Sequence, residues 1–244
     1  MSQQNPGVVI LKTGSTYPGI KEKFGDFDEW FVRGLSKSLD LTVVNTEAGE
    51  LPGDPAAWDG IVITGSPAMV SDREPWSEKA AEWLAQAVDK AVPLLGVCYG
   101  HQLLAHALGG DVGYHPGGRE SGTKRVELLA SARNDPLFRG MPDSFRAHLT
   151  HKQSVLRLPP NATLLGRNEF EPHQAFRIGK CAWGVQFHPE FSEGIMRAYL
   201  GVQAPELELE GLDSQAMIDA VTGAPEASGL LERFSAFVTE NKSG

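Results

Sequence analysis

The sequence predicts an α/β fold with a mostly parallel central sheet flanked by helices. In the first hundred residues, short apolar runs alternate with amphipathic stretches, which is the rhythm of parallel strands joined by helices. The chain has 244 residues, of which 41% are hydrophobic, so it is long enough to bury a core on both faces of a sheet. This length fits one large domain, or one domain with an appendage.

The first half of the chain contains the clearest alternation. Apolar residues recur at helical spacing after Asp26, which is expected to be the N-cap of the first helix. Strands are predicted at residues 8–11, 41–44, 61–63 and 94–97, and helices at 27–39, 76–91 and 101–108. Because ligands bind at the carboxyl ends of such strands, the turns at 65–67 and 98–100 are the first candidates for a site.

The second half is richer in β-type segments. Strands are predicted at residues 123–129, 155–158, 176–178 and 182–187, followed by a helix at 195–200. Residues 201–227 are expected to be loop with one short helix, and residues 230–238 to be an amphipathic helix. The apolar face of that helix requires a surface, most simply the same domain, with a partner protein as the alternative. We therefore expect a main domain at 1–200 and a C-terminal helical extension at 201–244 that packs on it.

The charge and cysteine content exclude several classes of protein. With 22 basic and 31 acidic residues the net charge is −9, so neither nucleic acid nor a membrane is an expected partner. Two cysteines are too few for a disulfide framework. The N-terminal stretch lacks a secretory-signal pattern, and no run approaches the roughly 20 apolar residues of a membrane span. A cytoplasmic location with reduced thiols is expected.

Cys98 stands at the centre of the strongest local motif. The segment Gly96-Val97-Cys98-Tyr99-Gly100 follows an apolar strand and precedes a helical run, which is the cysteine form of a nucleophile elbow. Flanking glycines limit crowding in the strained turn, and the positive end of the next helix favours a thiolate. The backbone N–H of Tyr99 is left free to face an oxyanion. The alternative is a buried structural cysteine at the end of a strand.

A second motif supplies a histidine and a carboxylate. Residues 183–187 are predicted to form a strand that runs into a turn, and residues two apart in a strand share a face. His188 and Glu190 would then lie on the same side, as a base and the carboxylate that orients it require. Taken alone, the segment could equally be a surface turn. A third turn, Gly65-Ser66-Pro67, could give a second oxyanion donor, from Ser66 or else Gly65, or could be an ordinary glycine-proline turn.

The segments ITGSP, GVCYGHQ and GVQFHPE together resemble the class I glutamine amidotransferases. The most similar members are the glutaminase domain of GMP synthase and its free-standing relatives. The resemblance covers roughly residues 8–195, with additional support from the segment at 119–122. It implies a flavodoxin-like sheet of the class I glutamine amidotransferase fold, with no metal and no organic cofactor.

The resemblance also implies a triad and a reaction. Cys98 would be the nucleophile, His188 the general base and acid, and Glu190 the carboxylate that orients His188. The implied chemistry is thioester formation at the γ-carbonyl of glutamine, release of ammonia, and hydrolysis of the thioester. A partner synthase could receive the ammonia, since the sequence has no ATP-binding loop and no second catalytic module.

The same resemblance assigns the residues around the triad. Ser66 and Tyr99 would donate the oxyanion-hole N–H groups, and Gln102 and Gly65 would contact the substrate. Relatives often carry a His-Gly-Asp-like segment that holds the amino-acid head, whereas this chain has His151-Lys152-Gln153-Ser154. Two further hypotheses therefore stay open: an autonomous γ-glutamyl peptidase with the same triad, and a non-catalytic binding module on the same fold.

Overall fold

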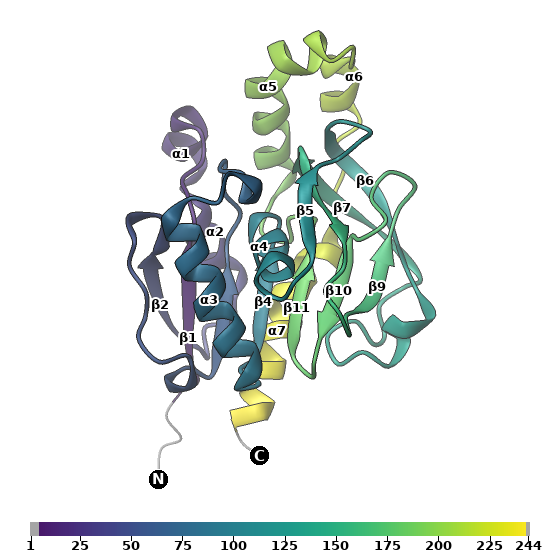
Figure 1. Cartoon of the computed structure of the whole chain (residues 1–244). Helices are drawn as coiled ribbons and strands as arrows, with labels where there is room; N and C mark the ends of the chain where they lie inside the picture. Colours follow the sequence, from purple (N-terminus) through teal and green to yellow (C-terminus); the bar gives the residue numbers. More distant parts are fainter. Residues whose placement is uncertain (1–4, 243–244) are drawn as a thin grey trace.

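A mixed nine-stranded sheet forms the centre of the molecule in a computed structural model that describes residues 5–242 (Figure 1). Expectations for residues 1–4 and 243–244, at the two ends of the chain, lie outside the described residues. One half of the sheet is parallel, as the alternation in the sequence predicts. Its strands are, in sheet order, β2 (Asp40–Asn45), β1 (Gly7–Lys12), β3 (Gly60–Ile63), β4 (Leu94–Val97) and β11 (Ala182–Val185).

The other half of the sheet is antiparallel and continues from β11. Its strands are β10 (Ala175–Ile178), β9 (Thr163–Arg167), β6 (Glu120–Leu128) and β7 (Ser144–His151). The strand expected at 155–158 is β8 (Gln153–Arg157), which pairs with β5 (Asp111–Tyr114) in a separate two-stranded sheet. The sequence did not predict β5, β7 or β9. These strands are short or carry charged residues, and pairing with neighbours distant in the sequence forms them.

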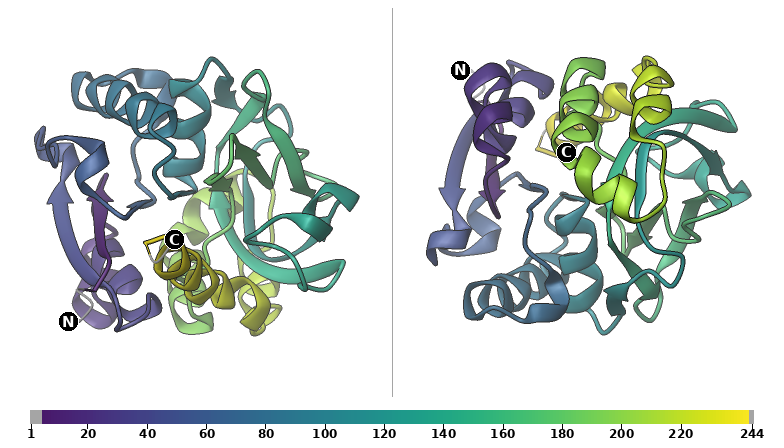
Figure 2. Two further views of the ribbon diagram at one scale, coloured as in Figure 1. Left: turned by 90° about the horizontal axis from the view of Figure 1, so that it is seen from below. Right: turned by 90° about the horizontal axis from the view of Figure 1, so that it is seen from above.

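Helices cover both faces of the parallel half, as Figure 2 shows from below. One face packs against α2 (Phe27–Gly34) and α7 (Pro225–Lys242), and the other against α3 (Pro75–Asp89) and α4 (Tyr99–Ala107). Asp26 caps α2 with a complete capping box, as the sequence predicts. The short helix α1 (Pro18–Phe24) was not predicted. None of the helices in the described residues is long and apolar enough to cross a membrane.

The C-terminal segment begins differently from the expectation. Helix α5 (Glu193–Leu209) continues through Pro205 instead of ending at 200, and α6 (Ser214–Asp219) follows it. The N–H that Pro205 lacks would have bonded to Gly201, and the burial of Leu207 in a core cluster holds the second half of the helix. Helix α7 then buries Leu230, Phe234 and Val238 on the sheet. We keep the division into residues 1–200 and an extension at 201–244 as a proposal.

Candidate active site

Cys98 lies in a strained turn between β4 and α4. Its φ of 50° is in the left-handed region, which costs energy for a residue with a side chain. A Cβ at Gly96 would lie 2.4 Å from the carbonyl oxygen of Gly100, and a Cβ at Gly100 would lie 2.6 Å from that of Ile63. Both positions therefore require glycine, and the turn presents the Cys98 side chain at the carboxyl edge of the sheet.

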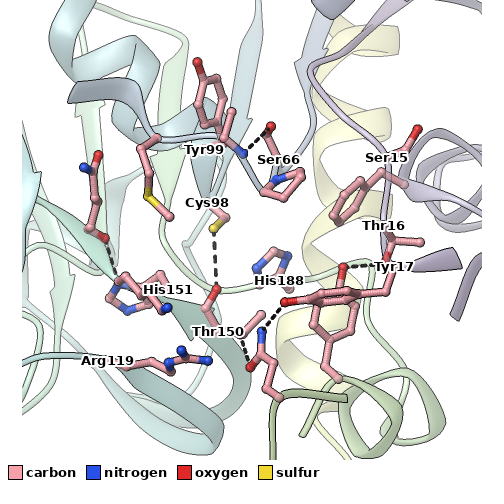
Figure 3. A pocket seen from close by; sticks show the side chains of 18 of the residues that line it. Ser15, Thr16, Tyr17, Ser66, Cys98, Tyr99, Arg119, Thr150, His151 and His188 are labelled. Atoms are coloured by element: carbon pink, nitrogen blue, oxygen red, sulfur yellow. Dashed lines mark hydrogen bonds between the residues drawn. The ribbon is translucent and has the colours of Figure 1, made fainter. Parts of the chain in front are cut away.

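The topology brings His188 to the same edge. Strands β4 and β11 are parallel neighbours, with Val97 opposite Val185, and the N–H of Cys98 donates to the Val185 carbonyl at 2.9 Å. The chain leaves β11 after Val185, earlier than predicted, and the N–H of His188 donates to the carbonyl of His148 at 2.9 Å. In Figure 3 the His188 ring lies beside the Cys98 sulfur.

Glu190 holds the ring of His188 from the opposite side to the pocket. The Nδ1–H of His188 donates to Oε1 of Glu190 at 2.7 Å, and both side chains are buried. The ring also stacks on Phe191 at 4.1 Å between centroids. Among the described residues, Nε2 of His188 has no hydrogen-bond partner other than the Cys98 sulfur, which lies on that side of the ring. These contacts fix the orientation of the imidazole.

The electrostatic surroundings favour a protonated His188. Burial alone lowers the pKa of the ring, but the charges of Glu190 and Cys98 outweigh it and raise the pKa to about 10. His148, behind the same turn, is different, since burial lowers its pKa to about 4. The positive charge is therefore concentrated on the one histidine that faces the cysteine.

The turn after β3 has a fixed peptide plane. The hydroxyl of Thr13 donates to the carbonyl oxygen of Gly65 at 3.1 Å, and that of Thr64 donates to the same oxygen at 2.9 Å. In a trans peptide the N–H points away from the C=O, so the N–H of Ser66 faces away from these buried hydroxyls. The N–H of Tyr99 is in the first turn of α4, where no preceding helical carbonyl can accept it. Both residues line the pocket beside Cys98.

A cavity of about 420 Å³ opens in front of Cys98 (Figure 3). Gln102 lines it, and its side-chain amide donates to the carbonyl of Gln153 at 2.7 Å and to Oε1 of Gln186 at 2.9 Å. Gly65 is not among the residues that line the cavity but packs beside two that do, since a Cβ at this position would lie 3.2 Å from Cε1 of His188 and 3.5 Å from Cε1 of Phe27. Aromatic side chains form the wall next to His188: Tyr17, Phe27 and Tyr199.

The segment at 151–154 also reaches the cavity, except for its last residue. His151 places Nε2 3.0 Å from Oε2 of the buried Glu120 and donates through Nδ1 to the carbonyl of Gln153 at 2.9 Å. Lys152 donates to Glu206 of α5 at 3.0 Å. Ser154 is buried elsewhere.

Sequence reasoning missed several residues of the site. Thr13 and Thr64 bond to the Gly65 carbonyl, and Phe191 stacks on His188. These contacts form only in the folded chain, so no local sequence pattern indicates them. Arg119 was noted for its motif but not as a lining residue, and Glu206 falls in a segment that was expected to be loop. The second cysteine, Cys181, is buried and donates to the carbonyl of Ala91 at 3.1 Å, away from the cavity.

The fold and the cysteine elbow define a class of protein. The chain matches the family model described as glutamine amidotransferase class-I over residues 24–201, most of its length. It therefore belongs to the class I glutamine amidotransferase family, which places it among the amide-hydrolysing enzymes.

Particular relatives agree with this membership. A GMP synthase (glutamine-hydrolysing) of Aeropyrum pernix is 38% identical over 187 residues, which are 76% of this chain and 33% of the relative. γ-Glutamyl peptidase 5 of Arabidopsis thaliana is 30% identical over 199 residues, 80% of this chain and 78% of the relative. A solved glutamine amidotransferase from Thermotoga maritima shares the fold, with a TM-score of 0.76 at 24% identity, over 97% of this chain and 99% of that one. The chain thus spans about a third of the GMP synthase.

Proposed function

We propose that this chain hydrolyses the γ-amide of glutamine, or of a related γ-glutamyl compound, through a thioester on Cys98. The observation that carries the proposal is that Cys98 and His188 meet at one cavity while Glu190 holds His188 from behind. Cys98 stands at the positive end of α4, Nε2 of His188 faces it, and Glu190 holds the other ring nitrogen at 2.7 Å.

The proposed reaction has two steps. In the first, the Cys98 thiolate attacks the γ-carbonyl carbon, the C–N bond breaks, and His188 gives its proton to the departing amine or ammonia. In the second, neutral His188 takes a proton from water, whose oxygen attacks the thioester carbon; the C–S bond breaks, and glutamate and the thiolate are released. The raised pKa of His188 supports the first role, because the ring carries a proton at neutral pH.

The negative oxygen formed in both steps requires donors. We assign this role to the backbone N–H groups of Ser66 and Tyr99, because both residues line the cavity beside Cys98. The Thr13 and Thr64 hydroxyls support this assignment, since they fix the peptide plane that carries the Ser66 N–H. Gln102 would meet the substrate through its side-chain oxygen.

The relatives support two versions of this function, a glutaminase that supplies a partner and an autonomous peptidase. Similarity to GMP synthases supports a separate synthase partner that receives ammonia. An autonomous γ-glutamyl peptidase is supported by the plant relative, which the chain matches over most of its length, and by the cavity. At about 420 Å³ the cavity is in the range of sites for ligands larger than a free amino acid. We also propose a cytoplasmic location, in which both thiols stay reduced.

The test is the release of glutamate and of ammonia or amine from glutamine and a panel of γ-glutamyl dipeptides. We expect Cys98→Ala to lower turnover by several orders of magnitude, because the nucleophile acts as part of a unit. Cys181→Ala is the matched control, and should leave turnover unchanged. Rapid turnover of dipeptides by the chain alone would favour the peptidase, whereas slow turnover raised by an added synthase would favour the partner-dependent glutaminase. Full activity in Cys98→Ala would contradict the proposal.

A further inference from the structure

A cluster of three charged side chains, Arg119, Lys152 and Glu206, lines the cavity on the side away from His188, and Glu210 lies behind it. Arg119 precedes β6, Lys152 follows β7, Glu206 lies in α5, and Glu210 is the C-cap of that helix. Nη2 of Arg119 donates to Glu206 and, at 3.0 Å, to Glu210, and Nζ of Lys152 donates to Glu206 at 3.0 Å. Figure 3 shows the Arg119 side chain directed into the cavity below Thr150. The cluster therefore faces the space that a substrate would fill.

The guanidinium of Arg119 is only partly satisfied. The Arg119 side chain is 2% exposed, and its hydrogen bonds to Glu206 and Glu210 both come from Nη2. Nε is buried and has no partner among the described residues. A buried cation with an unused donor is costly unless a ligand completes it. The planar fork of arginine matches the two oxygens of a carboxylate, which makes a carboxylate the fitting ligand.

The two cations of the cluster share a cavity with the nucleophile. The carbonyl oxygen of Thr150 is 4.0 Å from Sγ of Cys98, and Lys152 lies two residues further along the chain. Arg119 and Lys152 line the same cavity as Cys98, so a substrate held at the sulfur can reach these cations. Glu206 and Glu210 are largely exposed, with 54% and 37% of their side chains accessible, so they hold the outer edge of the guanidinium.

We propose that Arg119, with Lys152, forms a subsite for a carboxylate of the substrate, and that Glu206 and Glu210 are positioning residues for Arg119. The inference rests on the proposed function and adds a specificity determinant to it. The carboxylate has two chemical sources, the α-carboxylate of the γ-glutamyl group or a carboxylate on the leaving amine. Glu206 belongs to α5 beyond residue 201, so this half of the subsite lies outside the segment that matches the family.

The experiment compares three substrates that differ by one carboxylate. γ-Glutamylglycine carries both, γ-glutamylmethylamide lacks the one on the leaving group, and 4-aminobutanoylglycine lacks the α-carboxylate. Arg119 is expected to bind one of the two carboxylates. In Arg119→Ala we expect KM to rise about ten- to a hundredfold for the two substrates that carry that carboxylate, with a smaller change in kcat. The substrate that lacks it should not change. Arg119→Lys should recover part of the loss.

The pattern of the KM changes identifies the source. Changes for γ-glutamylglycine and γ-glutamylmethylamide alone assign the α-carboxylate, and changes for the two glycine conjugates alone assign the leaving group. Equal changes for all three substrates, or none, would overturn the inference. Arg157→Ala is the matched control, because Arg157 is an exposed arginine ion-paired to Asp111 at 2.8 Å. Melting temperatures of each variant check that the fold is intact.

A binding measurement separates this inference from the proposed function. Calorimetry measures the binding of γ-glutamylglycine to Cys98→Ala without any turnover. The measurement therefore tests the subsite even if the wild-type chain hydrolyses none of the substrates. We expect the added Arg119→Ala change to weaken binding of γ-glutamylglycine by the same factor as KM. We also expect it to leave the binding of one of the two single-carboxylate compounds unchanged. Absent binding, or binding that does not depend on Arg119, would overturn the subsite.

Discussion

The charge on His188 decides what the site can do at the scale of single residues. With a pKa raised to about 10, the imidazole carries a proton at neutral pH and is prepared to protonate a leaving amine. It can act as a base only after that proton has left, which orders the two proposed steps. Glu190 maintains this state at 2.7 Å, and Phe191 holds the plane of the ring.

Replacing Glu190 by Gln removes the charge that supports this state. Because the folded pKa of His188 is raised above 6.5, its protonation stabilises the fold fully below pH 6.5, and the contribution is lost as the pH rises toward about 10. We therefore expect the stability difference between wild type and Glu190→Gln to be largest near pH 6 and to shrink as the pH rises above 6.5 toward 10. Urea unfolding from pH 6 to 10 measures it.

The control for this titration is Glu193→Gln, which removes an exposed carboxylate of α5 that is ion-paired to Arg197. Its stability difference from wild type should not follow the same pH course. A difference for Glu190→Gln that is constant across this pH range would show that Glu190 does not set the charge of His188.

Single residues also show how far the sequence could predict the site. Cys98, His188 and Glu190 could be proposed from the sequence because a turn or a strand positions each of them within a few residues, and the structure places the three side by side. Arg119 and Glu206 were not paired in advance, because 87 residues separate them and only the folded α5 brings them together. Gly65 was expected to contact the substrate; it packs beside the rings of His188 and Phe27, and the substrate contact stays a prediction.

At the scale of elements, the turn after β3 is controlled by the ends of two neighbouring strands. Thr13 follows β1 and Thr64 follows β3, and both are fully buried. Their hydroxyls contact each other at 3.1 Å and both donate to the Gly65 carbonyl. The two strand ends thus fix the direction of the Ser66 N–H without any ligand.

Thr64→Val tests this control because valine keeps the shape and removes the hydroxyl. We expect kcat to fall by about ten- to a hundredfold with little change in KM, since the oxyanion forms only in the transition state. Steady-state kinetics on a turned-over substrate give both constants. The control is Thr46→Val, because the Thr46 hydroxyl is buried with no partner among the described residues. Equal kcat values in Thr64→Val and wild type would remove Thr64 from the proposed machinery.

Some strands and helices could be predicted from the sequence pattern and others could not. Strands 8–11, 61–63 and 94–97 were predicted because burial on both faces makes them continuous apolar runs. Strands β7 and β9 lack such runs, and long-range pairing decides them. The proline in α5 indicated a break, but tertiary packing of Leu207 overrides that local preference.

At the scale of the whole molecule, the sheet order makes the site. Strands β4 and β11 are neighbours although most of the antiparallel half lies between them in the sequence, and both end at the same edge. Helix α5 then rises beside that edge, as Figure 1 shows, and adds Gln203 and Glu206 to the cavity. The proposed extension at 201–244 would therefore serve the site as well as the core.

The most direct test of the central claim is the mass of the intact protein after treatment with a glutamine analogue that carries a diazoketone in place of the amide. We expect one adduct per chain, located on the peptide that contains Cys98, and none in Cys98→Ala. Excess γ-glutamyl substrate should slow its formation. An adduct on Cys181, or no adduct while Cys98 remains reduced and the protein folded, would contradict a nucleophilic Cys98.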